Sequence, residues 1–162
     1  MIFLRAFACA CLLAMASPVL AQGTQVAFGA TAQDTTAPIE VSASELAVDQ
    51  KTNTAIFTGD VVIIQGEMRL AADKVLVIYL KETQGISRLE ATGNVTVISG
   101  EDAAESQYAD YKVEEGLIEM TGNVLLTQGQ SALTADRMTV RLDDGTALMQ
   151  GRVKTILQPK ED

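Results

Sequence analysis

Apolar and polar residues alternate along most of the chain from about position 38 onward. Val75, Val77 and Tyr79 share one face of such a run, and Met138 and Val140 share one face of another. A two-residue period in segments rich in Val, Ile and Thr is typical of β-strands, and no window of ten or more residues has helical spacing. The pattern predicts an all-β domain with eight long strands, at about 39–49, 53–65, 67–80, 87–99, 104–113, 116–128, 131–142 and 146–157.

Two short units recur along these strands. In the first unit a glycine is followed by one polar residue and then by Val. Its four glycines are Gly59, Gly93, Gly122 and Gly151. The second unit pairs Ala with a polar residue, at Ala43-Ser44, Ala72-Asp73, Ala104-Glu105 and Ala135-Asp136. Because Gly-Asp and Gly-Asn pairs adopt positive φ at little cost, we expect the strands to bend or bulge at these points.

The four glycines are separated by 34, 29 and 29 residues, and each interval holds about two strands with their turns. Self-similarity of this kind marks an architecture in which one unit cannot bury its apolar face alone and stacks on its neighbours. Kinks at the recurring units would divide many strands in two. The sequence therefore predicts a tall, stacked β-sandwich or jelly roll rather than a closed barrel.

The first residues have the order of an export signal. Arg5 supplies a positive charge, the run from Phe7 to Met15 is apolar but too short to span a bilayer, and Val19-Leu20-Ala21 is a small-x-small cleavage pattern. We expect a signal peptide at 1–21, cleaved after Ala21, with a buried N-terminal helix as the alternative. The rest should comprise a flexible segment at 22–37, one β-domain at 38–158 and a tail at 159–162.

Composition excludes several kinds of chemistry. The formal charge of −9 becomes −10 once Arg5 is removed, which argues against binding to nucleic acid. The chain has no His, and Cys9 and Cys11 lie in the signal, so the common catalytic triads and metal ligands are missing. Three carboxylate pairs could serve a glycosidase or bind Ca²⁺, but we expect them to be solvated turn residues. They are Glu101-Asp102, Glu114-Glu115 and Asp143-Asp144. No catalytic residue, metal site or cofactor is expected.

Some strands have more apolar residues than a sheet needs when one of its faces is exposed to solvent. The runs at 61–64 and 75–80 are apolar on both faces, and the inward side chains are mostly Val, Ile, Leu and Met. Such side chains could line a site for a flexible hydrocarbon chain. They could equally fill an ordinary sandwich core, and the residues alone leave both interpretations open.

The glycine motifs lie in register with the alanine units and follow an export signal and the segment Pro38-Ile39-Glu40-Val41. In this combination the chain resembles the OstA-like family of periplasmic lipopolysaccharide-transport proteins, over about 38–157. The resemblance implies a slightly twisted β-jelly roll in the periplasm, open along one side, that catalyses nothing and shelters the acyl chains of lipid A. It also implies end-to-end assembly of copies between an LptC-like inner-membrane partner and an LptD-like outer-membrane partner.

The resemblance also suggests residues for the lipid site. The family's first strand contributes lipid-facing residues, which correspond here to Ile39 and Val41. Alternation adds ten interior candidates: Val61, Ile63, Val75, Val77, Val95, Val97, Val124, Leu126, Met138 and Val140. For assembly, unpaired strands are expected at the two ends of the domain, near 39–48 and 146–157. The alternatives are an LptC-like or other OstA-domain lipid-binding protein, a structural β-solenoid without ligand, and a glycan-cleaving enzyme.

Overall fold

The computed structural model describes residues 23–29 and 32–157, and these residues form strands and turns only. The all-β prediction is confirmed, and the described residues include no helix long and apolar enough to cross a membrane. The predicted signal peptide at 1–21 and the tail at 159–162 lie outside the described residues.

The strands form one antiparallel sheet in which chain neighbours are mostly sheet neighbours. Their order is β1-β10-β9-β8-β7-β6-β5-β4-β2, with β3 also paired to β4 and β11 to β9. The bounds are β1 Thr24–Ala27, β2 Glu40–Ser42, β3 Glu45–Asp49, β4 Thr54–Gln65, β5 Met68–Tyr79, β6 Ile86–Ser99, β7 Asp102–Lys112, β8 Leu117–Gln128, β9 Ser131–Arg141, β10 Thr146–Gln150 and β11 Lys154–Ile156. The sheet therefore grows hairpin by hairpin and does not close on itself.

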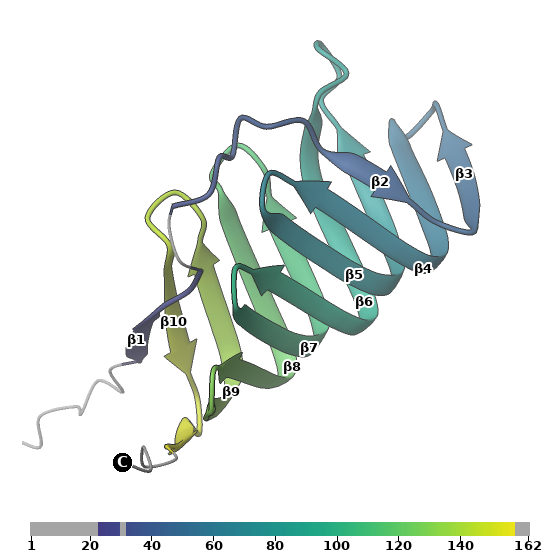
Figure 1. Ribbon diagram of the computed structural model, residues 1–162. Coiled ribbons are helices and arrows are strands. Elements are labelled where there is room, and N and C mark those ends of the chain that lie inside the picture. The colour runs from purple at the N-terminus through teal and green to yellow at the C-terminus, as the bar shows by residue number, and fades with distance from the viewer. Residues whose placement is uncertain (1–22, 30–31, 158–162) are drawn as a thin grey trace, which may run out of the picture.

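A line of β-bulges crosses the sheet and folds it in two. The register shifts between Thr58 and Val61 where β4 pairs with β5, and equivalent shifts occur at each pairing from there to β9. At the glycine units φ is between 77° and 87° for the glycine and between 44° and 50° for the polar residue that follows. Every long strand bends at this line (Figure 1). The predicted open jelly roll, with kinks at the recurring units, is confirmed.

The fold line divides the roll into two arms that face each other. Arm A consists of β2, β11 and the strand halves at 61–65, 68–72, 95–99, 102–106, 124–128 and 131–135. Arm B consists of β1, β3, β10 and the halves at 54–58, 74–79, 86–92, 108–112, 117–121 and 137–141. The side opposite the fold line, between the two rims of hairpin turns, is the open side of the roll.

Contacts between neighbouring strands explain why the two sequence units recur together. The carboxylate of Asp73 packs against Gly93, where an added Cβ would lie 2.5 Å from Oδ2, and it accepts a 2.8 Å hydrogen bond from Asn94 Nδ2. Asp136 packs in the same way against Gly151 and is held by two nitrogens of Arg152. Gly59, Gly93 and Gly151 thus make room for the polar residue of an alanine unit, whereas Gly122 makes room for Gln107.

The segment before Pro38 differs from the expectation. Thr24–Ala27 form β1, which pairs with β10 at the far end of the roll, and Phe28 is only 1% exposed. The chain then returns along the open side to β2 (Figure 1). We call residues 28–29 and 32–39 the strap. The prediction of an unstructured lead-in is therefore wrong for Thr24–Phe28, because an unpaired edge such as that of β10 can order any extended segment that meets it.

The same strand corrects the predicted edges. At one end the outer strands are β2 and β3, as expected. At the other end β10 is covered by β1, so the outer strands among the described residues are β1 and β11.

Candidate functional site

The facing surfaces of the two arms form one apolar interior. Directly paired residues on neighbouring strands share a face, so the register defines continuous rows of side chains from one end of the roll to the other. The row on arm A is Val41, Ile63, Leu70, Val97, Ala104, Leu126 and Leu133. The two rows on arm B are Ala55, Val77, Leu89, Tyr111, Ile118, Val140 and Ala147, and Phe57, Val75, Ala91, Ala109, Met120, Met138 and Met149.

The structure brings all twelve candidate residues to this interior. Ile39 and Val41 are half-buried and pack against the core from the β2 end. The other ten have exposures of 0 or 1%: Val61, Ile63, Val75, Val77, Val95, Val97, Val124, Leu126, Met138 and Val140.

Further lining residues were not among the sequence candidates. They include Leu70, Leu89, Ile118, Met120, Leu133 and Met149. The alternation of Ile118 and Met120 with polar neighbours was a usable signal. Phe28 and Tyr111 carried no comparable signal, because Phe28 follows a polar segment and β7 is rich in Ala and polar residues.

The interior is packed, and one polar contact joins the two arms through it. Tyr111, on arm B, is fully buried and donates its hydroxyl proton to Gln65 Oε1 on arm A, at 2.5 Å. Burial raises the pKa of the Tyr111 hydroxyl to about 12. Because the lining side chains fill the space between the arms, a chain-like ligand could enter only if the arms separate or the side chains rearrange.

The apolar lining reaches the surface at the β3 end. Leu46 pairs with Phe57 and Val48 with Ala55, so both extend the arm B rows onto the edge strand. No strand lies beyond them among the described residues, and their exposures are 57% and 63%. The interior therefore ends in an uncovered apolar surface at this end of the roll.

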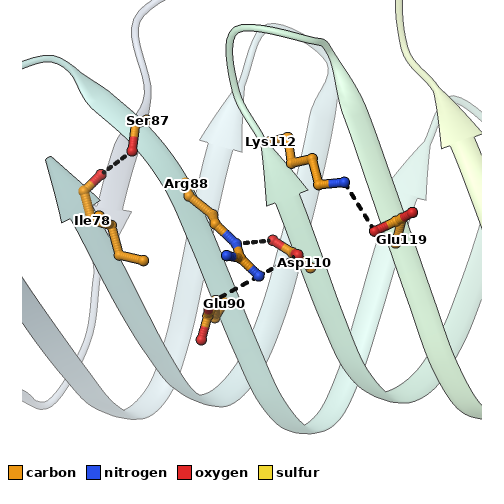
Figure 2. Close-up of polar contacts among 7 residues, drawn as sticks. All are labelled: Ile78, Ser87, Arg88, Glu90, Asp110, Lys112 and Glu119. Carbon is orange, nitrogen blue, oxygen red and sulfur yellow. Dashed lines mark hydrogen bonds and ion pairs between the residues drawn. The ribbon is translucent and has the colours of Figure 1, made fainter. Parts of the chain in front are cut away.

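The outer face of arm B carries a ladder of charged side chains (Figure 2). Arg88 donates from Nε and Nη2 to the two carboxylate oxygens of Asp110, at 2.7 and 2.6 Å, and lies 3.2 Å from Glu90. The hydrogen bonds that Arg88 donates to Asp110 raise the pKa of Arg88 further above its usual range. One step along the sheet, Lys112 pairs with Glu119 at 3.2 Å. These pairs alternate with inward apolar residues and make the outer face polar along β6 to β8.

Replacing Arg88 by alanine should lower the free energy of unfolding by about 1–2 kcal/mol, because the side chain of Asp110 is only 8% exposed and would lose both hydrogen bonds from Arg88. This range allows for the partial exposure of Arg88. Lys112→Ala is the matched control, since both side chains of that pair are partly exposed, at 34% and 40%, and neither is nearly buried as Asp110 is. Urea unfolding of the two variants checks this. Equal losses of stability in the two variants would mean that the near-burial of Asp110 does not strengthen its pairing with Arg88.

The alternative chemistries find little support in the described residues. The carboxylate pairs lie in or beside hairpin turns, as expected, although Asp102 also accepts a hydrogen bond from Gly29 N. A cavity of about 440 Å³ lies beside the fold line, and Asp136, the one carboxylate among the described residues that line it, is paired with Arg152. This cavity thus lacks the two facing carboxylates of a glycosidase. No group of three or more acidic, His or Cys residues in the described ranges could hold a metal ion.

Comparisons with known proteins agree with this geometry. The lipopolysaccharide export system protein LptA of Escherichia coli K12 is 35% identical over 81 residues, which are 50% of this chain and 43% of that protein. The protein of the same name from Shigella flexneri matches equally. The chain thus spans less than half the length of these relatives.

A solved structure supports the fold. The crystal structure of LptH from Pseudomonas aeruginosa, described as the LptA-homologous periplasmic component of a lipopolysaccharide transport device, superposes with a TM-score of 0.69. It covers 78% of this chain and 99% of the LptH chain at 17% identity. Residues 40–146 match the family model described as LptA/(LptD N-terminal domain) LPS transport protein, and since they make up more than half of the sequence, the chain belongs to that family.

Proposed function

We propose that this protein is a non-enzymatic periplasmic carrier that shelters the acyl chains of lipopolysaccharide between its two arms. One observation carries the proposal: the three rows of inward side chains run through β4 to β9 on both arms and are apolar apart from the hydroxyl of Tyr111. Burying acyl chains is worth roughly 0.8 kcal/mol per CH₂ group, so such a lining can retain a lipid that water would reject. The twelve sequence candidates are then the lipid-contacting residues.

The proposal includes end-to-end assembly. Most exposed large apolar side chains lie at the ends of the roll: Leu46 and Val48 on β3, and Ile156 and Leu157 at β11. Edge strands with uncovered apolar residues are suited to pairing with another chain. We propose that these edges join copies of the protein and connect them to an LptC-like partner at the inner membrane and an LptD-like partner at the outer membrane.

Photo-crosslinking in cells tests the carrier role. A crosslinker placed at Val41, Ile63 or Val77 should give adducts with lipopolysaccharide, because these side chains belong to the interior rows. The matched controls are Ile64 and Ile78, which follow directly on the same strands but point to the outer face. They should give few or no adducts.

The packed interior favours a second candidate, a structural β-module without ligand. The structural module is supported over the carrier if no interior position gives an adduct while the circular dichroism spectrum and the melting temperature of the variants remain normal. Adducts of equal yield at Ile63 and Ile64 would indicate nonspecific contact with lipid and would also count against the carrier.

A further inference from the structure

The strap is fastened to the rims of both arms. On the arm B rim, Phe28 N donates to Gly145 O and Gln33 N donates to Leu142 O, each at 2.8 Å. On the arm A rim, Gly29 N donates to Asp102 Oδ2 at 2.8 Å and Gln33 Nε2 donates to Ser99 Oγ at 2.7 Å. Gln65 Nε2 donates to the strap carbonyls Thr35 O and Ala37 O, at 2.8 and 3.1 Å. The strap therefore bridges the two arms across the open side, over hairpins from β4–β5 to β9–β10 (Figure 1).

The arm A rim is built to hold this segment. Beside the hairpins of this arm runs an inward-facing row that is apolar at Met68 but contains four polar residues, Gln65, Ser99, Asp102 and Gln128. Each of them bonds a backbone or side-chain group of the N-terminal segment. A rim facing only water would not need four side chains aimed at one extended segment.

One apolar side chain of the strap, Phe28, is fully buried in the interior, while Ile39 beside β2 is half-buried against it. Phe28 is 1% exposed and belongs to the same core cluster as the lining residues. The other described strap residues, apart from Gln33, are half-buried or exposed. The strap is thus held by one buried ring and by hydrogen bonds that water can replace, and this makes it more easily released than any interior strand.

A lipid with a large polar headgroup can bury its acyl chains only by a route that leaves the headgroup in water. Along the length of the roll, that route is the gap between the two rims, which the strap bridges. We propose that residues 28–29 and 32–37 of the strap form a latch, that they leave the open side when acyl chains enter, and that the position of Phe28 is then a subsite for an acyl chain. This inference rests on the proposed lipid-carrier function.

A disulfide can hold the latch closed. A Cβ added at Gly29 would lie 3.2 Å from Ser99 Cβ, close to the separation of roughly 3.5–4.5 Å that disulfides bridge. Gly29→Cys and Ser99→Cys are introduced together in the full chain, with Cys9→Ser and Cys11→Ser, so that the introduced thiols are unique. The probe is lipopolysaccharide with a fluorophore on its sugar, and the rate of its uptake is followed by anisotropy. The oxidised protein should take it up at least about tenfold more slowly than the same protein after reduction.

The two single-cysteine variants, treated with the same oxidant, are the controls. Gly29→Cys alone keeps the backbone strain and Ser99→Cys alone lacks the hydroxyl, but neither can form the bridge. Reduction should therefore not change the rate of lipid uptake by either variant. A release variant, Phe28→Ala, should take up lipid faster than the wild type. Equal uptake by the oxidised and reduced forms would overturn the latch and leave the carrier function standing, since lipid would then enter from the β3 end. Absence of uptake by every form, including Phe28→Ala, would overturn the carrier function together with the latch.

Discussion

Replacing Gly122 by alanine should lower the free energy of unfolding by about 3 kcal/mol. Gly122 lies on the fold line with φ at +87°, where a side chain is strained, and a Cβ there would meet Gln107 Cβ at 2.8 Å and Cγ at 3.1 Å. Because the nearest obstacle is a Cβ fixed to the backbone of β7, the neighbour cannot rotate away. The strands β7 and β8 would have to separate at the bulge. Urea unfolding measures the change.

Gly129→Ala is the matched control, because it separates crowding from backbone strain. Gly129 also has positive φ, +57°, but lies in a hairpin turn where an added Cβ would meet nothing within 4 Å. Gly129→Ala should lower the free energy of unfolding by about 1 kcal/mol, the usual penalty of a left-handed conformation. If the two variants lost the same stability, close packing at the fold line would not be the reason for the recurring glycines.

The sequence predicted those parts of the fold that depend on local chemistry. The glycine units marked the bulges because positive φ has a compositional signature, and alternation placed Val61, Ile63, Val75 and Val77 in the interior because the side-chain period of a strand is two. Both signals lie within a few residues of the feature that they predict.

The parts that were missed depend on pairing between distant segments. β1 is ordered by the edge of β10, more than a hundred residues away, and only Val26 of its four residues is partly buried. Tyr111 finds its partner Gln65 because the two arms face each other, and no local pattern encodes that contact. Likewise, alternation cannot distinguish a lipid lining from a filled core, since both bury the same residues.

The packed interior and the strap together suggest how one molecule could be both stable and open to a ligand. The lining side chains of the two arms are mostly Ala, Val, Ile, Leu and Met in rows, and the strap over the open side adds only one buried ring. If the arms part along the open side, the fold line and the β-ladders can remain intact, because the hydrogen bonds of the ladders run within each arm. Opening then costs free energy only where contacts are broken, at the strap and across the interior. The hydrogen bond between Tyr111 and Gln65 is one of these contacts.

Raising the pH should weaken that contact and destabilise the fold in a defined window. The pKa of Tyr111 is about 12 in the folded protein and 10.0 as the ordinary value. Between these values the folded form retains a proton that the unfolded form has released, so stability falls as pH rises, by roughly 1.4 kcal/mol per unit. The contribution of Tyr111 is complete below about pH 10 and should be lost by about pH 12, a total of roughly 2.7 kcal/mol.

Tyr111→Phe isolates this contribution from lysines and other tyrosines that titrate in the same range. Near neutral pH the variant should be less stable than the wild type by about 1–2 kcal/mol, because Gln65 Oε1 loses its donor inside the protein. As the pH rises above 10, the wild type should lose this advantage and then become the less stable of the two, since only it must bury or expel a phenolate. The measurement is the free energy of unfolding in urea at intervals from pH 8 to the highest pH at which unfolding is reversible. A constant difference between the two proteins across this range would mean that Tyr111 titrates normally and that the arms do not enclose it.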